Sequence, residues 1–383
     1  GIIPAMIYYG LQILHPSIFL PACIVICAII SLATGSSWTT SATVGIALIG
    51  IGKVLGIPLG MVAGAVISGA YFGDKLSPLS DTTNLAPAMA GGELFSHIRY
   101  MSLTTIPSIV ITLIVFLILS LTQETTGQAD TLTLMAAIKE KFTINGWLFL
   151  VPATVILLIV KKSPPLIALL VGTLMGGIFA LLFQSDILLE ITQSSTLTSE
   201  VAYRAIMDAI SVSTEITTSN ALLNDLFTSG GMEGMLGTIW LIICAMVFGG
   251  IMDAIGALER ISSALLDWAQ TTFQLFASTV ASCLAINLTA SDQYLSIVIP
   301  GKMFAKAYKE RKLAPENLSR TLEDSGTVTS VLIPWNTCGA YQSGVLGVGV
   351  GEYFIYAIFN WISPFMTLLY AAFDIKIKAL KEK

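Results

Sequence analysis

Residues 73–84 read Gly-Asp-Lys-Leu-Ser-Pro-Leu-Ser-Asp-Thr-Thr-Asn and lie between apolar runs with no charge on either flank. Pro78 lacks an N–H, and its ring clashes with the carbonyl four residues earlier, which belongs to Asp74. This predicts a helix that breaks at Pro78 and leaves a backbone oxygen beside the Asp74 carboxylate. The stretch therefore indicates a broken helix with two acids, Asp74 and Asp81, next to the break.

The rest of the chain is poor in charge. Of its 383 residues, 55% are hydrophobic and 11% are charged, whereas a typical soluble domain is about 25% charged. Residues 1–92 contain four charged side chains, three of them in the stretch quoted above, and residues 325–351 contain none. The composition excludes a disordered chain, a basic nucleic-acid-binding protein, an ordinary cytosolic enzyme and a Cys-rich disulfide scaffold. We expect the lipid bilayer to be its solvent.

Apolar runs of about 20 residues, the length of a membrane helix, occur at 100–122, 145–160, 165–183, 235–255 and 352–374. Other apolar stretches are interrupted by polar residues, Gly or Pro; they cover residues 17–57, 58–92, 272–301 and 317–340. The predicted fold is an all-α polytopic membrane protein with about ten helical segments. The chain starts at Gly1, and we expect about two further helices before it, because the symmetry described next requires them.

The interruptions recur in two halves of the chain. Ser36 and Pro78 are 42 residues apart, and Ser291 and Pro334 are 43 apart. Paired broken helices in corresponding positions are typical of secondary transporters built from inverted repeats. We therefore predict a first repeat, a polar connection, and a second repeat that contains a further polar connection; these are residues 1–122, 123–144, 145–383 and 184–230.

Basic residues indicate the orientation. The connection 302–316 contains five Lys or Arg residues, and the tail 376–383 contains four Lys. Loops rich in Lys and Arg lie on the cytoplasmic side of a membrane. Both segments are therefore predicted to be cytoplasmic.

The polar side chains at the breaks suit Na⁺, because a hard cation prefers oxygen ligands. A carboxylate inside the membrane also holds a proton more readily, so Na⁺ and H⁺ can compete for it. Asp74 and Asp81 would lie about 10 Å apart along an unbroken helix, and unwinding at the break shortens that distance. The alternative is structural: Asp74 forms an ion pair with Lys75 or another cation, or the cluster is a polar loop.

Candidate ligands at the breaks follow from the same argument. Besides Asp74 and Asp81, the predicted cation- and proton-binding residues are Thr83, Asn84, Ser36, Ser37, Ser291, Asp292, Asp324, Asn336 and Thr337. The predicted helix-breaking residues are Gly35, Pro78, Pro87 and Pro334. Glu323 is interpreted as an interfacial charge, and Glu200, Arg204, Asp208 and Glu215 as one face of an amphipathic surface helix.

Several motifs resemble those of the NhaC family of Na⁺/H⁺ antiporters. The resemblance is specific at residues 73–87 and extends to 34–40, 45–48, 68–72 and 291–336. It implies an antiporter of the bacterial inner membrane with inverted repeats and broken helices. The family also includes antiporters that exchange malate and protons for Na⁺ and lactate, so the resemblance does not fix the substrate.

Two functions are therefore compared. The first is exchange of Na⁺ for H⁺ by alternating access; the alternative is an antiporter of Na⁺-lactate against malate and protons. The absence of Arg at any break favours a small cation, because a bidentate Arg is the usual clamp for a carboxylate. No phosphate-binding loop, nucleophile motif or zinc motif is present in the sequence, so neither an enzyme nor a cofactor is expected. A homodimer is compatible with this prediction.

Overall fold

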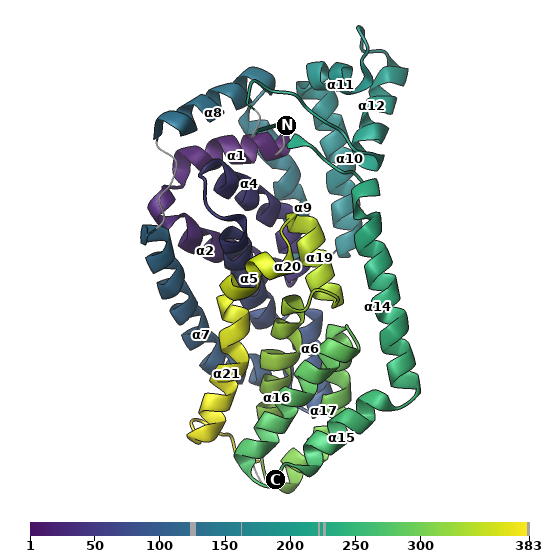
Figure 1. Ribbon diagram of the computed structural model, residues 1–383. Helices are drawn as coiled ribbons and strands as arrows, with labels where there is room; N and C mark the ends of the chain where they lie inside the picture. Colours follow the sequence, from purple (N-terminus) through teal and green to yellow (C-terminus); the bar gives the residue numbers. More distant parts are fainter. Residues whose placement is uncertain (123–127, 162, 221–222, 225–226, 381–383) are drawn as a thin grey trace.

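The computed structural model describes residues 1–122, 128–161, 163–220, 223–224 and 227–380. Within these ranges the chain forms helices, and the only bridges of β type are two isolated pairs. Figure 1 shows an elongated bundle with α11 (Ser185–Thr192) and α12 (Ser199–Ser211) at one end and the C-terminus at the other. The predicted all-α fold is confirmed.

The first part of the bundle contains the first two predicted breaks. Its elements are α1 (Ile2–Ile13), α2 (Phe19–Thr34), α3 (Ser37–Thr40), a π-helix (Ser41–Gly45), α4 (Ile46–Val54), α5 (Leu59–Leu76), α6 (Asp81–Ala90) and α7 (Leu94–Thr122).

The middle of the chain adds helices with little polar contact to the breaks. They are α8 (Gln128–Lys141), α9 (Leu150–Val160), α10 (Pro165–Phe183), α11, α12, α14 (Leu236–Ala254) and α15 (Ala257–Asp267). The predicted polar connection 123–144 thus contains α8, while its residues 123–127 lie outside the described residues. The connection 184–230 contains α11 and α12, and its residues 221–222 and 225–226 also lie outside the described ranges. The predicted amphipathic helix is α12, but it ends before Glu215.

The last part carries the third and fourth breaks. Its elements are α16 (Thr272–Thr289), α17 (Gln293–Glu310), α18 (Pro315–Leu322), a π-helix (Glu323–Thr327), a short 3₁₀ helix (Ser330–Leu332), α19 (Thr337–Leu346), α20 (Val350–Tyr353), a second 3₁₀ turn (Phe354–Tyr356) and α21 (Ile358–Ala372).

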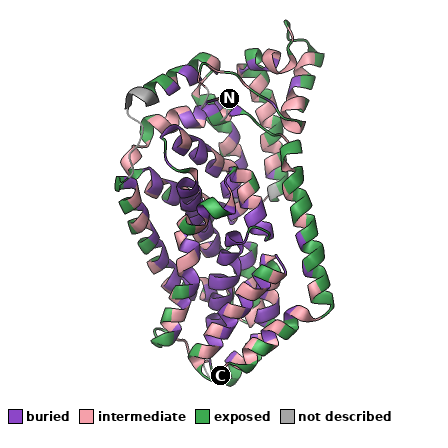
Figure 2. Ribbon diagram, viewed as in Figure 1, coloured by how far each residue is buried: buried purple, intermediate pink, exposed green. Residues whose placement is uncertain are grey.

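Five helices in the described residues are long and apolar enough to cross a membrane, and two bent pairs raise the number to seven. The single helices are Pro16–Thr34, Leu94–Thr122, Leu166–Phe183, Glu233–Ala254 and Thr272–Thr289. The bent pairs are Leu132–Lys141 with Gly146–Ile159, at 89°, and Val350–Tyr356 with Ile358–Ala372, at 52°. The candidate spans differ in burial: Figure 2 shows α14 exposed along most of its length, while the centre of the bundle is buried.

Helices end at each of the four predicted interruptions. After α2, Gly35 takes a left-handed conformation with φ of 67°. Residues 77–80 separate α5 from α6, residues 290–292 separate α16 from α17, and residues 333–336 precede α19. Pro87 is different, because α6 continues through it. The prediction of a helix break at Pro87 is therefore wrong: one missing N–H is tolerated there, and the break falls at Pro78.

The breaks meet in pairs. A Cβ atom on Gly35 would lie 2.6 Å from the Leu79 carbonyl carbon, so the first break packs directly on the second. In the last part of the chain, the Thr337 N–H donates to the Ser291 carbonyl at 2.9 Å, which joins the third break to the fourth. The irregular backbone is thereby covered by protein, as non-helical backbone at membrane depth requires.

Close packing of α2 on α5 positions the second break. Cβ atoms on Gly69 and Gly73 would lie 2.3 Å from the carbonyl oxygens of Ile24 and Ala28, so only glycine allows this approach. Small residues four apart are the usual means of bringing two membrane helices together. The contact fixes the last turn of α5, which carries Asp74.

Candidate functional site

Asp74 is a buried carboxylate, and its two oxygens differ in the hydrogen bonds that they accept from the described residues. Oδ2 accepts hydrogen bonds from the Ser37 N–H at 3.0 Å and the Ser37 hydroxyl at 2.7 Å. Oδ1 has no hydrogen-bond partner among the described residues, although the Ser80 hydroxyl is near enough to interact with the carboxylate. Ser37 follows the first break, so Asp74 links the first two breaks through its side chain.

Glu323 is a second buried carboxylate of the same kind. Its side chain is fully buried, which makes the prediction of an interfacial charge wrong, because α18 continues into the protein interior at this point. Oε1 accepts a hydrogen bond from the Thr82 hydroxyl at 3.0 Å, and Oε2 has no partner in the described part of the chain. The hydroxyls of Thr82 and Ser80 are 3.2 Å apart. A line of hydroxyl groups thus connects Glu323 to the neighbourhood of Asp74.

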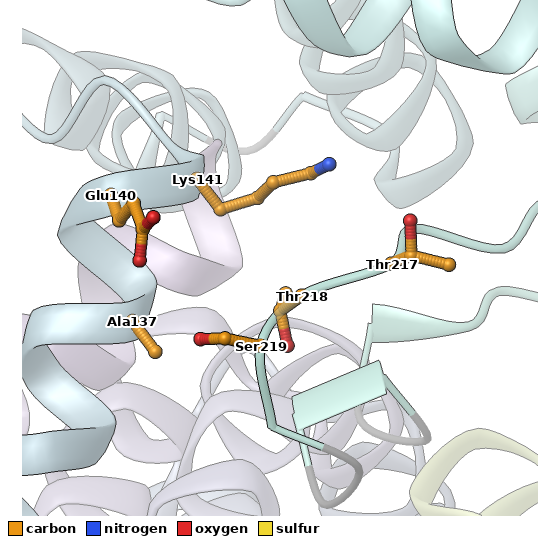
Figure 3. Close-up of a pocket in the computed structure, with 6 residues that line it drawn as sticks. All are labelled: Ala137, Glu140, Lys141, Thr217, Thr218 and Ser219. Atoms are coloured by element: carbon orange, nitrogen blue, oxygen red, sulfur yellow. The ribbon is translucent and has the colours of Figure 1, made fainter.

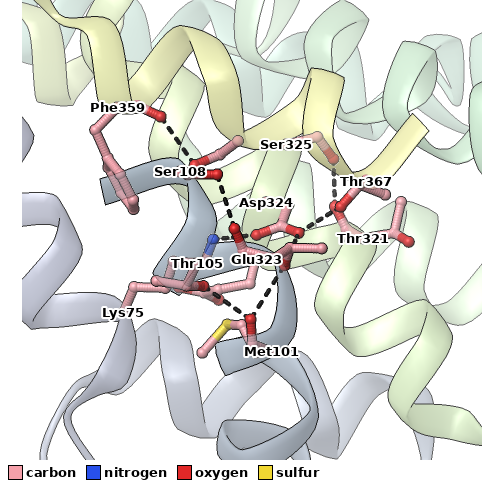
Figure 4. Close-up of polar contacts among 12 residues, drawn as sticks. Lys75, Met101, Thr105, Ser108, Thr321, Glu323, Asp324, Ser325, Phe359 and Thr367 are labelled. Carbon is pink, nitrogen blue, oxygen red and sulfur yellow. Dashed lines mark hydrogen bonds and ion pairs between the residues drawn. The ribbon is translucent and has the colours of Figure 1, made fainter. Parts of the chain in front are cut away.

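Lys75 forms a buried ion pair with Asp324 beside these two acids (Figure 4). Both side chains are 0% exposed. The other Asp324 oxygen accepts hydrogen bonds from the Thr104 hydroxyl at 2.9 Å and from the Thr367 hydroxyl. The pair joins α5 to the second half of the chain. The partner of Lys75 is thus Asp324, and the alternative in which Asp74 pairs with Lys75 is not what the structure shows.

A π-helix carries Glu323 and Asp324. Single π turns inside α-helices are frequent at functional sites. Two buried amides hydrogen-bond the backbone in and after this turn: Asn287 Nδ2 donates to the Gly326 carbonyl, and Asn360 Nδ2 donates to the Val328 carbonyl, each at 2.7 Å. These contacts hold the two acids in place on a backbone that has left the α-helical hydrogen-bond pattern.

Asp81 and Asn84 lie on the exposed side of α6. The Tyr294 hydroxyl donates to Asp81. The Asn84 amide donates to the backbone carbonyls of Pro78 at 3.0 Å and Ser80 at 2.6 Å, which stabilises the local turn. Among the described residues, no hydrogen bond joins Asp74 to Asp81, so a shared ion site at these two acids stays a prediction.

The backbone carbonyl of Asp74, which Pro78 was expected to leave without a hydrogen-bond donor, accepts hydrogen bonds in the structure. The Thr83 hydroxyl lies 3.3 Å from the Asp74 carbonyl oxygen and 3.1 Å from that of Lys75, and it donates to both. The Ser77 N–H also donates to the Asp74 carbonyl, at 3.0 Å. Thr83 therefore closes the end of α5.

Other predicted ligands cap the helices that follow the breaks. Ser36 accepts from the Thr39 N–H at 3.1 Å, Asp292 from the Leu295 N–H at 3.0 Å, and Asn336 from the Cys338 N–H at 3.1 Å. Asn336 also donates to Asn287 at 3.2 Å, and the Thr337 hydroxyl lies 3.5 Å from Asn336. Ser291 has a positive φ of 60°. These side chains form the breaks and do not point as a group at Asp74.

Arg320 is a charged residue that the sequence analysis did not single out. It is 0% exposed and lies one helical turn before Glu323. Its guanidinium carbon is 4.6 Å from the centre of the Tyr100 ring. No Arg lies within a break, as the sequence indicated, but α18 leads directly into the fourth break and brings the Arg320 guanidinium close to it. The spacing Arg-x-x-Glu-Asp ahead of Pro334 was the available signal.

Two other observations concern where a cation could bind and which side chains could hold it. A polar pocket of about 400 Å³ is lined by α8 and residues 217–219, as Figure 3 shows, and contains none of the predicted ligands. Among the described residues, no group of three or more His, Cys, Asp and Glu side chains could hold a metal ion. A cation at the breaks would thus be coordinated by at most two carboxylates together with hydroxyl and backbone oxygens.

Comparison with known proteins points to the same family as the sequence motifs. A family model described as the Na⁺/H⁺ antiporter family matches residues 69–375. The Na⁺/H⁺ antiporter NhaC of Alkalihalophilus pseudofirmus is 38% identical over 379 residues, which cover 98% of this chain and 79% of the relative. The malate-2H⁺/Na⁺-lactate antiporter of Bacillus subtilis is 37% identical over 367 residues (95% and 74%). The arginine/ornithine antiporter ArcD of Halobacterium salinarum is 35% identical over 373 residues (96% and 74%).

Proposed function

The chain belongs to the Na⁺/H⁺ antiporter family, and from this premise we propose that it exchanges Na⁺ for H⁺ across the bacterial inner membrane by alternating access. The observation that carries the proposal is the pair of buried carboxylates, Asp74 and Glu323, each with one unpartnered oxygen. An ionised carboxylate inside a membrane protein is costly unless it is paired. Binding of either Na⁺ or a proton would remove that cost at each of the two acids.

Competition between the two ions follows from elementary electrostatics. Desolvation favours the protonated form of each acid, and a nearby Na⁺ favours the ionised form. Loading Na⁺ from one side would therefore expel a proton, and loading a proton would expel Na⁺. The hydroxyls of Ser80 and Thr82, between the two acids, would supply neutral oxygen ligands. Asp324 is already paired with the Lys75 ammonium, which would leave it out of this competition.

The breaks are proposed to allow the conformational change. Because they meet in pairs, movement at the Gly35 break would displace residues 79–80, and movement at Ser291 would displace Thr337. The division into inverted repeats, 1–122 and 145–383, stays a prediction, and so does a homodimer.

A cytoplasmic position for the basic segments has structural support. The Ala314 N–H donates to the Lys378 carbonyl at 2.9 Å, and the Lys378 ammonium forms an ion pair with Glu316 at 2.6 Å. The connection 302–316 and the described part of the tail 376–383 therefore lie on the same side; Lys381 and Lys383 are outside the described residues. Both segments are rich in Lys and Arg, and we propose that this side is the cytoplasm.

The test uses purified protein in liposomes with an imposed pH gradient. Addition of Na⁺ alone is expected to collapse the gradient. Asp74→Asn and Glu323→Gln should each reduce the rate at least about 100-fold, because each removes the charge on which the two ions compete. Asp253→Asn removes an exposed acid at the end of α14 and serves as the matched control. Full exchange in both site variants would contradict the assignment.

The alternative is exchange of Na⁺ and lactate against malate and protons. The malate-2H⁺/Na⁺-lactate antiporter of Bacillus subtilis is 37% identical to this chain, and Arg320 supplies a buried guanidinium next to the fourth break. The same liposomes discriminate the two functions. A gradient that remains until lactate or malate is added would favour the organic-acid antiporter.

A further inference from the structure

Arg320 is a buried cation without hydrogen bonds. None of its three side-chain nitrogens has a hydrogen-bond partner among the described residues, although a guanidinium offers five N–H donors. Aromatic rings surround it instead: its guanidinium carbon lies 4.6 Å from the Tyr100 ring centre, 5.8 Å from that of Tyr370 and 6.0 Å from that of Phe276. Cation–π contacts hold the charge without neutralising it.

The charge has acids within reach. Glu323 and Asp324 follow Arg320 by three and four residues, which are the spacings of neighbours on a helix surface. On α7, the Tyr100 ring lies 4.6 Å from the Arg320 guanidinium carbon, and the Thr104 hydroxyl, one turn further on, donates to Asp324 at 2.9 Å, so both charges face the same side of this helix. In a low-dielectric interior, such charges interact without forming a direct ion pair.

A charge count follows for the buried region around the second and fourth breaks. The buried charged side chains there, within the described ranges, are Asp74, Lys75, Arg320, Glu323 and Asp324, together with Glu316, which is left out of the count because Lys378 neutralises it in an ion pair at 2.6 Å. Three are acidic and two are basic, so 2 − 3 gives a net charge of −1. One Na⁺ or one proton therefore makes the region neutral. Without Arg320 the count would be 1 − 3 = −2, and one monovalent ion would leave it charged.

We propose that Arg320 is a positioning residue that sets the charge of the exchange site to −1 and thereby fixes its affinity for Na⁺ and the pH range in which it works. This inference rests on the proposed Na⁺/H⁺ exchange. The aromatic rings leave the guanidinium charge available to the acids, because no hydrogen-bonded counter-ion occupies it. Arg320 does not itself bind the transported ion.

Several other titratable groups lie near Arg320 and the acids. His97, on α7, interacts with Asp324, Lys75 and Glu316. Glu316 is paired with Lys378, which is about one-third exposed, so solvent screens that pair. The remaining titratable neighbours are the hydroxyls of Tyr100, Tyr308 and Tyr370 and the Cys283 thiol. Among these groups and those counted above, the only permanent positive charges buried with the acids are Lys75 and Arg320.

The experiment measures Na⁺-driven proton movement in liposomes as a function of pH. Arg320→Met keeps an unbranched apolar side chain between the rings and removes the charge. The pH of half-maximal activity should rise by about one unit, because a more negative site holds its proton more tightly. The KM for Na⁺ at alkaline pH should fall by about ten-fold for the same reason. Arg320→Lys should leave both within about two-fold of wild type, since it keeps the charge.

The matched control is Lys306→Gln, which removes a positive charge from an exposed side chain, 85% accessible, on α17. Solvent screens this charge, so neither quantity should move. If Arg320→Met is slower but keeps the wild-type pH midpoint and KM, the residue is merely structural and the inference is overturned. If wild type shows no Na⁺-driven proton movement, the proposed function fails, and that result is obtained before any variant is made.

A double variant tests the inference in case the Arg320→Met protein does not fold. Arg320→Met combined with Glu323→Gln removes one charge of each sign and restores the net −1. If the single variant fails to accumulate but the double variant accumulates and is monodisperse in detergent, the charge pairing is supported. If neither accumulates, Arg320 is required for packing alone, which contradicts the inference.

Discussion

Asp81 and Glu323, two acids beside predicted breaks, differ in burial. Asp81 is surrounded by polar residues in the sequence and was predicted to bind the ion, yet it is exposed and bonded to Tyr294. Glu323 was interpreted as an interfacial charge, yet it is fully buried with one unpartnered oxygen. The sequence places both acids beside a break. Which one is covered depends on α17 and α18, which are far away in the chain.

The Thr82 hydroxyl is expected to be a ligand-positioning group. Thr82→Val keeps the shape of the side chain and removes the hydrogen bond to Glu323. The KM for Na⁺ should rise by about ten-fold, since one hydrogen bond to a charged group contributes about 1.5–3 kcal/mol. The control is Thr105→Val, because the Thr105 hydroxyl is buried but donates only to the Met101 carbonyl of its own helix. Equal effects of both variants on KM would refute this role.

The Lys75–Asp324 pair predicts non-additive effects on stability. Lys75→Met or Asp324→Asn alone leaves a buried charge without its partner and should destabilise the protein by about 3–5 kcal/mol. The double variant should recover most of that loss, because the remaining side chains are neutral. Thermal unfolding of the four proteins in detergent measures the coupling. Additive losses would show that the two residues do not stabilise each other.

At the scale of elements, local residues determine where helices end. Gly35, Pro78 and Pro334 were sufficient to predict three breaks, because a left-handed turn or a missing N–H acts within four residues. Asp292 and Asn336 cap α17 and α19, which the sequence also indicates, because an Asp or Asn at the start of a helix is a known cap signal; their predicted role as ion ligands stays a prediction. The π-helix at Glu323–Thr327 had no signal in the sequence, because contacts with Asn287 stabilise it.

The contact between α2 and α5 gives a prediction for glycine. Gly73→Ala would place a methyl group 2.3 Å from the Ala28 carbonyl oxygen, so α5 must move away from α2 and carry Asp74 with it. We expect at least a ten-fold loss of exchange and a lower melting temperature. Gly250→Ala, on the exposed side of α14, has no atom within 4 Å of the new methyl group.

This control should be neutral or slightly stabilising, since Ala is a better helix former than Gly by about 1 kcal/mol. Exchange and thermal unfolding are measured for both glycine variants. A Gly73→Ala protein that matches the Gly250→Ala protein in both would show that the close approach of α2 to α5 is unimportant.

At the scale of the whole molecule, the basic segments and α11–α12 lie at opposite ends (Figure 1). In a variant without the native cysteines, Lys306→Cys should react with a membrane-impermeant maleimide only in inside-out vesicles. Ser195→Cys, in the exposed loop after α11, should react only in right-side-out vesicles. Reaction of both from the same side would contradict the proposed topology.

Composition and the spacing of apolar runs predicted the class of this fold well, since lipid restricts a spanning chain to a few solutions. They did not predict which acids face which bases. The pairing of Lys75 with Asp324 joins residues 249 positions apart, and no pattern within one helix records such a contact.

That separation has a consequence for biogenesis. When α5 enters the membrane during synthesis, its lysine has no distant acid to neutralise it, because the residues that supply one are translated about 10–50 s later at 5–20 residues per second. For that interval Lys75 depends on its neighbour Asp74 or on the insertion machinery. A chain whose translation stops before α18 would therefore lack the acid that pairs with Lys75 in the complete fold.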